Sequence, residues 1–455
     1  KKSLRKRLLF IGGIGITGAA IGVLVLALIF VVSQSILKKE LLSLVLKGGI
    51  SEHSIIVEKN NLGKISNFVG IQADAYGSII DSNLISQATS MVRISEDVQV
   101  MPQVLLEANE ASKNLFLQVL AGNSGKTTEL AEILDDKIRL AYEKLSNIQA
   151  SLEQVDFNVD SAEISSVVKE YESELVKLRS GMAIQQQLHP IISSLTGEES
   201  KKTYAIILQN NQELRPTGGF IQAIALLNFD QGTLVSHEVY SVYDLDKNLP
   251  GEIIPPEDIK KYLGEEKWYL RDSNWSPDFP TVSKQVEWFL NKSLGINVDG
   301  VIALNLFSVK DILEATGPID LPEYNEVLTY KNLLERMEFH SEVVLVNSPE
   351  SIDYSVTIFK KLINKIITID RDNVSPLLSA IHDSLDENQL LISVFEESDQ
   401  LVLHSLGWTG SLVEPQCPTR LSVVDCRVDV MAQVEANIGV NKANYYLDRE
   451  INHKV

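Results

Sequence analysis

The sequence has few of the residues on which many enzymes depend. It contains two cysteines, Cys417 and Cys426, and seven scattered histidines without the spacing of metal ligands. No Ser-His-Asp or Cys-His arrangement is recognisable, so nucleophilic hydrolysis has no support. Two cysteines alone do not make a zinc site. Outside the cytoplasm the pair is expected to form a disulfide that closes a short loop, and the alternative is two free thiols.

Positive charge is also scarce. The chain has 41 Lys and Arg against 61 Asp and Glu, which gives a net charge of -20. The first seven residues, KKSLRKR, hold five of the positive charges and no acid, so the remaining chain is even more acidic. Nucleic-acid binding needs a basic surface that neutralises phosphates. The composition therefore excludes nucleic acid as the main partner.

Charge is absent altogether from residues 8–32, LLFIGGIGITGAAIGVLVLALIFVV. A helix of that length spans a hydrocarbon core of about 30 Å. The basic cluster before it predicts a cytoplasmic N-terminus, so residues 1–36 are expected to be a basic tail and a single transmembrane helix in the plasma membrane. The body would then be extracytoplasmic. A cleaved signal peptide is the alternative, although its apolar region is normally shorter.

The apolar run contains small residues in the stretch GGIGITGAAIG. Small residues at such spacing let two transmembrane helices approach closely, which would give a homo-oligomer. The alternative is a tolerated glycine content without any partner.

Proline and glycine are sparse between residues 37 and 200, where helical periodicity dominates. One stripe has steps of three and four residues and comprises Ile164, Val167, Tyr171, Leu175, Leu178 and Met182. A second comprises Leu134, Ile138, Tyr142, Leu145 and Leu152. Such stripes form one apolar helix face that must pack against a partner. Residues 37–200 are therefore expected to form an extracytoplasmic helical bundle or stalk.

Branched and aromatic residues become frequent after residue 200. The runs TYAIILQ, FIQAIALLNF, TLVSHEVYSVY and DGVIALNL are typical of strands. Two helices are expected among them: TVSKQVEWFLNKSL, ending at Gly295, and a second capped by Ser308 and ending at Gly317. Residues 201–410 are thus predicted to be one mixed α/β domain, in an α+β or α/β protein. Residues 411–455 read as the start of a β-rich segment that is incomplete within this chain.

The stretch NNQELRPTGGF, residues 210–220, places polar groups between two expected strands. The amides of Asn210 and Asn211 and the guanidinium of Arg215 could hold a phosphate or a carboxylate. Glycines after a strand are a turn signal. The alternative is a hairpin whose amides close their own turn and whose arginine pairs with an acid.

A second polar stretch is LRDSNWSPDFP, residues 270–280. Asp272 and Asp278 carry oxygen ligands of the kind that Mg²⁺ or Ca²⁺ takes. Arg271 could neutralise a phosphate, and Asn274 and Trp275 could contact a sugar or an apolar ligand. The alternative is a loop leading into the next helix with its aromatic side chains packed inward.

The stretches YAIILQNNQELRPTGGFIQAIALL, RDSNWSPDFPTVSKQVEWF and VDGVIALNLFSVKDILEATGPIDL resemble a large bacterial family of membrane-anchored envelope proteins, known only as a domain of unknown function (DUF4012). The similarity covers about residues 200–340 and NIGVNKANYYLDREI near the end. It implies a cell-envelope protein but no activity.

Residues 281–321 also resemble a segment of the LytR-CpsA-Psr enzymes, in which a helix, G-I-x-V/I-D, a strand and a short helix follow one another. Those enzymes are anchored by one N-terminal helix. They transfer glycopolymers from a polyprenyl-pyrophosphate carrier to the cell wall, with Mg²⁺ and arginines on the pyrophosphate. Arg215 matches their first arginine in type, but Thr217 and Gly218 stand where an aspartate is expected. In the next strand Asp244 matches while Tyr243 replaces an arginine.

Two functions follow from these features. The first is a structural or ligand-binding protein of the cell surface, whose ligand is a cell-wall glycan, a polyprenyl-phosphate-linked glycan or an envelope protein. The second is a Mg²⁺-dependent transferase of lipid-linked phosphoglycans, with Arg215 and Arg271 as phosphate clamps and Asp272 and Asp278 as metal ligands. The acidic body and the missing arginines favour the first.

Overall fold

A computed structural model describes most of the chain after residue 81, namely residues 82–121, 127–154, 162–340, 349–412, 431–439 and 447–452. The apolar run at residues 8–32 and the cysteines Cys417 and Cys426 lie outside the described residues. Within the described ranges, no helix is both long enough and apolar enough to cross a membrane.

The chain divides into two compact units. The first contains the described residues between 82 and 112 and between 130 and 189, and the second contains residues 113–129 and those from Pro190 onwards. The sequence placed the boundary between the helical segment and the α/β domain at residue 200. In the structure the last helix of that segment ends at Leu195.

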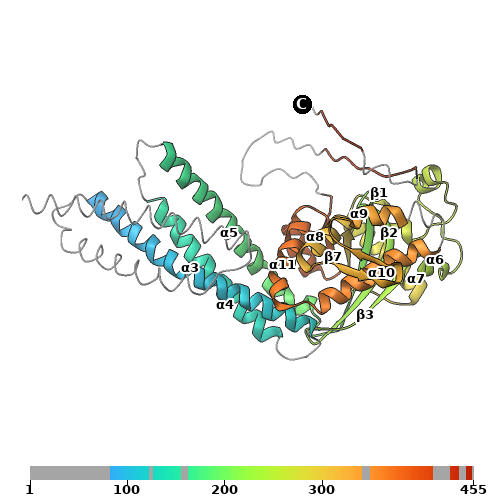
Figure 1. The fold of residues 1–455 in the computed structure, drawn as a ribbon, viewed down its shortest axis with the longest axis horizontal. Coiled ribbons are helices and arrows are strands. Elements are labelled where there is room, and N and C mark those ends of the chain that lie inside the picture. The colour runs from blue at the N-terminus through green and yellow to red at the C-terminus, as the bar shows by residue number, and fades with distance from the viewer. Residues whose placement is uncertain are drawn as a thin grey trace, which may run out of the picture. The chain divides into compact units, whose positions relative to one another are not determined.

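Three helices build the first unit: α3 (Ser82–Leu120), α4 (Thr127–Leu152) and α5 (Ala162–Leu195), whose ends extend into the second unit (Figure 1). Ile138 and Leu145 of the apolar stripe predicted for α4 are buried, which confirms the predicted packing face at these two positions. Its core pairs Met101, Val104 and Leu105 with Ala141, Leu145 and Ile148. Met182 of α5 packs against this cluster. The predicted helical segment is thus confirmed for the described residues.

A five-stranded sheet forms the centre of the second unit, in the order β3-β2-β1-β4-β7 (Figure 1). The strands are β1 (Lys202–Arg215), β2 (Gly218–Asp230), β3 (Thr233–Ser241), β4 (Gly300–Asn305) and β7 (Leu390–Val394). β1 is parallel to β4, and the other neighbours are antiparallel. The carboxyl ends of β1 and β4 therefore meet at one edge of the sheet. The predicted mixed α+β class is confirmed.

The helix α7 (Phe279–Leu294) covers one face of this sheet. Its residues Val282, Val286 and Phe289 are fully buried, as their spacing predicts, against Ile207 of β1 and Val301 of β4. The helix ends at Gly295, which has a φ of 70° as a left-handed cap requires. Alternate residues of β1 such as Tyr204 and Leu208 are also buried. Since alternate strand residues point to opposite faces, the sheet is covered on both.

Shorter elements complete the second unit. A two-stranded ribbon joins β5 (Ile319–Leu321) to β6 (Glu326–Leu328). The single-turn helices are the π-helix η1 (Ile259–Leu263) and the 3₁₀ helices η2 (Leu270–Trp275) and η3 (Pro322–Tyr324). The α-helices are α6 (Val242–Lys247), α8 (Leu306–Thr316), α9 (Leu333–Glu338), α10 (Pro349–Ile367), α11 (Arg371–Asp386) and α12 (Glu397–Ser405).

Three local predictions need correction. The strand expected to reach Tyr243 ends at Ser241, and the chain turns into α6. Helix α8 starts at Leu306, so Ser308 is buried inside it and is not its cap. The described parts of the expected C-terminal β segment, residues 431–439 and 447–452, carry no regular secondary structure. Sequence patterns locate elements better than they locate their ends, because packing against the sheet decides where a helix begins.

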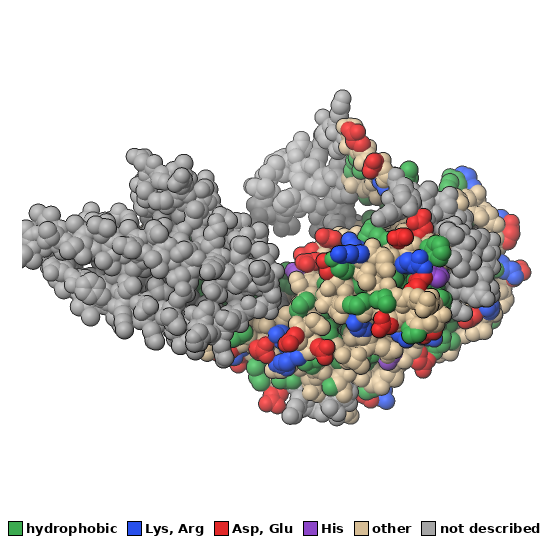
Figure 2. All heavy atoms as spheres, viewed as in Figure 1, with side chains coloured by type: hydrophobic (Ala, Val, Ile, Leu, Met, Phe, Trp, Pro, Cys, Tyr) green, Lys and Arg blue, Asp and Glu red, His purple; other side chains and the backbone are tan. Residues whose placement is uncertain are grey.

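The surface of the second unit mixes charges of both signs. Figure 2 shows acidic and basic side chains scattered among one another on the face in view, with hydrophobic side chains in small groups. The visible face therefore carries no extended basic area of the kind that a polyanion needs.

Candidate functional site

The polar stretch at residues 210–220 forms the irregular end of the β1–β2 hairpin. The register shifts there, since Asn210 pairs with Phe220 while Leu214 pairs with the adjacent Gly219. The residues between Asn210 and Leu214 therefore bulge out of the ladder. Bulges of this kind re-aim side chains and are frequent next to functional sites.

The two glycines at the start of β2 are required by close approach. A Cβ on Gly219 would lie 2.2 Å from the carbonyl of Asn210, a contact that no side chain can make. Gly218 has a φ of 141°, and a Cβ there would lie 2.4 Å from Asn305 Oδ1 and 2.5 Å from Gln209 Oε1. The glycines thus let β2 pass directly over the bulge and bring two amide groups against Gly218.

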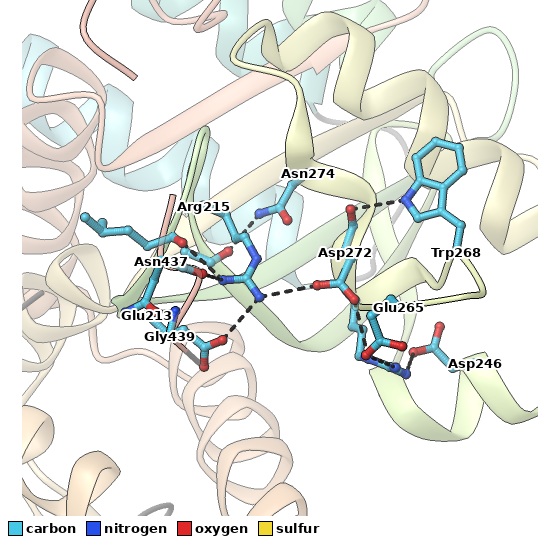
Figure 3. Close-up of polar contacts among 12 residues, drawn as sticks. Glu213, Arg215, Asp246, Glu265, Trp268, Asp272, Asn274, Asn437 and Gly439 are labelled. Carbon is cyan, nitrogen blue, oxygen red and sulfur yellow. Dashed lines mark hydrogen bonds and ion pairs between the residues drawn. The ribbon is translucent and has the colours of Figure 1, made fainter. Parts of the chain in front are cut away.

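The side chain of Arg215 is only 2% exposed and is held by acids. Its Nη2 lies 3.2 Å from Glu213 Oε1 and 3.3 Å from Asp272 Oδ1 (Figure 3). Its Nη1 donates to the backbone oxygens of Leu214 and Asn437, at 3.2 and 3.3 Å. A second backbone bond runs from Asn437 N to Leu214 O, at 2.9 Å. The far C-terminal segment thereby closes over the end of β1.

Arg271 extends this network on the other side of Asp272. Its Nη1 lies 3.0 Å from Asp246 Oδ2, its Nε 3.5 Å from Asp272 Oδ2, and its Nη2 3.4 Å from Glu265 Oε1. The guanidinium also lies over the ring of Tyr269, 3.8 Å from its centroid. We call this network the ionic cluster, and it comprises Glu213, Arg215, Asp246, Glu265, Arg271 and Asp272 (Figure 3).

Burial dominates the acid–base behaviour of the cluster. It raises the pKa of Asp246 to about 6, even though the charge of Arg271 acts to lower it. Burial likewise raises the pKa of Asp272, against the opposing effect of Arg215 and Arg271. Burial disfavours the charged form of each carboxylate by more than the neighbouring arginines favour it. Apart from Glu265, whose side chain is 37% exposed, the side chains of the cluster are largely buried.

The predicted metal ligands have other partners. Asp278 caps α7: its Oδ2 accepts from Thr281 N at 3.0 Å, and its Oδ1 from Leu412 N at 3.1 Å. Asp272 belongs to the ionic cluster. Among the described residues, no group of three or more His, Cys, Asp or Glu side chains is placed to hold a metal ion. The geometry gives no support for the pair as a Mg²⁺ site.

The predicted ligand-binding amides have different surroundings. Asn210 is buried, and its Oδ1 accepts from Gln212 N at 3.0 Å within the bulge. Asn274 is fully buried and donates to Gly219 O at 2.7 Å, which fixes η2 against the start of β2. Trp275 is half-buried, with its ring 6.0 Å from the guanidinium of Arg215. Asn211 lines a cavity, whose lining includes none of Asn210, Asn274 and Trp275.

That cavity lies at the edge of the sheet where β1 and β4 end and has a volume of about 650 Å³. We call it the amide pocket. Its walls come from the β1–β2 turn, the end of β4 with the first residues of α8, the chain before β7, and the C-terminal segment. The lining residues are Asn211, Leu214, Pro216, Thr217, Gly218, Pro277, Asn305, Phe307, Glu387, Asn388, Gln389, Leu391, Gly410, Ser411 and Arg449. Crevices at the carboxyl ends of strands are common ligand sites in sheets of this kind.

Several amide atoms at the pocket have no hydrogen-bond partner among the described residues. They are Asn305 Oδ1 and Asn211 Oδ1 in the wall and Gln209 Oε1 directly behind Gly218. Asn305 is only 6% exposed, and its Nδ2 lies 3.3 Å from Gln389 Oε1. A buried polar group without a partner costs about 1–3 kcal/mol. Unsatisfied amide oxygens beside a cavity make this cavity a candidate ligand site.

Residues 199–340 match the family model described as "Protein of unknown function (DUF4012)". These residues form a DUF4012 domain. The domain includes β1, β2 and β4, and with them the bulge, the ionic cluster and half of the amide pocket. No curated protein matches the chain. The pocket is completed by residues beyond the DUF4012 domain, from the chain before β7, from the turn after α12, and from the C-terminal segment.

Sequence reasoning missed the residues that complete both regions. Asp246 was overlooked because the resemblance to the transferases pointed to Asp244, at the end of a strand expected to reach Tyr243. Asp244 proves exposed and paired with Lys247. Asn305 stands at the end of a clear strand, and a polar residue at that position was a usable signal. Gln389 and Arg449 carry no such signal in the sequence, because only the folded chain brings them to the pocket.

Proposed function

We propose that this chain is a single-pass, membrane-anchored protein of the bacterial cell envelope whose α/β domain binds a ligand outside the cytoplasm. The basic cluster followed by the uncharged run at residues 8–32 supports the anchor. The match to DUF4012 supports an envelope protein, because the resemblance to that family is the reason why we expect one. The ligand site is the amide pocket.

The contrast between paired charges and unpaired amides carries this proposal. Arg215 and Arg271 each contact two or more carboxylates at 3.5 Å or less, so neither offers an uncompensated charge to a phosphate. The pocket wall instead contains two amide oxygens, Asn211 Oδ1 and Asn305 Oδ1, that accept no hydrogen bond from another described residue. Binding requires complementary groups that are available, and here those groups are neutral.

The alternative, a Mg²⁺-dependent phosphoglycan transferase of the LytR-CpsA-Psr type, requires arginines on a pyrophosphate and carboxylates on a metal. In this domain the candidate arginines and Asp272 neutralise one another inside the ionic cluster. Asp278 is occupied as a helix cap. These contacts favour binding over transfer.

The experiment uses the full chain purified in detergent micelles and incubated with solubilised envelope fragments of the source bacterium. We expect fragments to be retained by the wild-type protein and lost with Asn211→Trp, which fills the pocket from its half-exposed wall. Asn291→Ala, an exposed asparagine on α7 outside the pocket, is the matched control. Retention that survives Asn211→Trp would show that the pocket is not the binding site.

The same preparation separates binding from transfer. Lipid-linked phosphoglycan and Mg²⁺ are added, and the release of the lipid carrier is measured. We expect no release above a blank without protein. Release that depends on Mg²⁺ and disappears in Arg215→Lys, which keeps the charge but not the forked geometry, would favour the transferase instead.

A further inference from the structure

We infer that the amide pocket recognises an uncharged, hydroxyl-rich ligand, a neutral saccharide, and that it discriminates against phosphate-bearing ligands. This inference rests on the proposed binding function and assigns the chemical class of its ligand. It is carried by the hydrogen-bonding groups, the charges and the apolar surfaces of the pocket, which are independent observations.

The hydrogen-bonding groups require a ligand that can donate. The partnerless atoms of the lining residues, Asn305 Oδ1 and Asn211 Oδ1, are acceptors. A hydroxyl group donates one bond and accepts two, so it pairs with an amide oxygen or with an amide nitrogen, whichever faces it. Phosphate oxygens at neutral pH mostly accept, and they would leave these carbonyl oxygens unsatisfied. The pocket is thus matched to hydroxyls.

The charges at the pocket point in the same direction. Its two charged lining residues are Glu387 and Arg449. Arg449 lies with its Nε 2.6 and 2.8 Å from the carboxylate oxygens of Glu435, so its charge is compensated. Glu387 is exposed beside α8, where it adds to the rise that burial causes in the pKa of Asp311. The lining therefore offers an anion no cation that lacks a carboxylate partner.

The apolar surfaces suit the C–H faces of sugar rings. The lining combines the apolar residues Leu214, Pro216, Pro277, Phe307 and Leu391 with amides and with the hydroxyl-bearing residues Thr217 and Ser411. A saccharide ring presents both kinds of group, hydroxyls at its edge and C–H groups on its faces. Pockets that combine apolar walls with a few placed polar groups are typical of small-ligand sites, and about 650 Å³ lies within their usual range.

An extended peptide fits this site less well. Peptides are commonly held by adding a strand to an open sheet edge. β1 and β4 lie inside the sheet, each paired on both sides, so the pocket offers side chains rather than an unpaired backbone. The observations therefore favour a saccharide, and a peptide becomes one outcome of the test.

The test measures binding by the full chain in detergent, by calorimetry and by competition against envelope fragments. The probes are a neutral hexose oligosaccharide, a neutral N-acetylhexosamine oligosaccharide, inorganic pyrophosphate with Mg²⁺, and an uncharged pentapeptide. We expect at least one neutral oligosaccharide to bind and to displace the fragments. Pyrophosphate and the peptide are expected to do neither.

Two variants connect the binding to the inferred atoms. Asn211→Ala and Asn305→Ala each remove one partnerless amide oxygen and are expected to weaken saccharide binding about tenfold, as the loss of a single hydrogen bond would. Asn291→Ala should leave it unchanged. Because Asn211 is half-buried and lies in a bulge, its variant is expected to fold even if Asn305→Ala does not.

The outcomes separate this inference from the proposed function. Fragments that bind through the pocket but are displaced only by pyrophosphate or by the peptide overturn the saccharide and leave the binding function intact. Saccharide binding that is equal in wild type, Asn211→Ala and Asn305→Ala also overturns the inference. If no envelope fragment is retained at all, the proposed function itself fails.

Discussion

The ionic cluster and the amide pocket adjoin the same β1–β2 turn but differ in whether their polar groups have partners. In the cluster, two arginines and four carboxylates lie within 3.5 Å of a partner of opposite sign. In the pocket, neutral amide atoms remain without a partner among the described residues. Leu214 and Pro216 line the pocket, whereas Arg215 between them belongs to the cluster.

This difference separates structural polarity from functional polarity. Charge attracts attention in a sequence, and an arginine in a polar loop resembles an anion clamp. A charge that is fully compensated inside the fold is held there because removing one partner would leave the other buried alone. A neutral amide without a partner has no such internal explanation. The less conspicuous residues are therefore the better candidates for binding.

The largest expected effect comes from breaking the cluster. Arg215→Met removes the guanidinium that lies between Glu213 and Asp272 and leaves Asp272 with Arg271 alone, and we expect the free energy of unfolding to fall by about 3–5 kcal/mol. Denaturant unfolding followed by tryptophan fluorescence measures this, since all four tryptophans lie in the second unit. The control Lys247→Met breaks an ion pair whose side chains are 74% and 66% exposed. It should cost about 1 kcal/mol or less, and equal losses in the two variants would contradict the structural role of Arg215.

A smaller effect is expected from pH. The pKa of Asp246 in the folded protein is about 6, above its unfolded value, so the folded state binds a proton more tightly. Its contribution to stability is therefore greatest below the unfolded pKa, near 4, and is lost as the pH rises through 6. Asp246→Asn cannot titrate. The unfolding free energy of the wild type minus that of Asp246→Asn should fall by up to about 3 kcal/mol between pH 4 and pH 7. A difference that stays constant would count against this account.

The smallest effect compares two buried asparagines. Asn274 donates to Gly219 O at 2.7 Å, whereas Asn305 Oδ1 has no partner among the described residues and its Nδ2 makes one long contact of 3.3 Å. We expect Asn274→Ala to lower the free energy of unfolding by about 1–3 kcal/mol and Asn305→Ala by less than about 1 kcal/mol. Thermal and denaturant unfolding give both values. A larger loss for Asn305→Ala would make it a structural residue and remove it from the proposed site.

Much of the fold could be predicted from local patterns. The runs around Ile207 and Val301 were recognisable as strands, and the spacing of Val282, Val286 and Phe289 predicted the buried face of α7. These signals are local because they depend on which face of a strand or helix is buried. The sites were harder, because Arg215 meets Asp272 and Asn437, which are 57 and 222 residues away. Composition identified the polar stretch but could not identify its partners.

The bulge itself shows the limit of the sequence argument most clearly. Two glycines after a polar run predicted a turn, and a turn is present at Pro216 and Thr217 between β1 and β2. The close approach of Gly219 to the backbone of Asn210 depends on a register shift that no residue type announces. The choice between an anion clamp and an internally paired arginine depended on that shift, because it determines which side chains face inward.

The contact between Asn437 and the end of β1 also sets an order of events in time. Arg215 is synthesised long before Asn437, and the two are 222 residues apart. A chain made from its N-terminus can fold β1 and β2 first, but it cannot complete the pocket until the segment that carries Asn437 and Arg449 has followed. Under the proposed function, a partly made chain therefore lacks a complete ligand site.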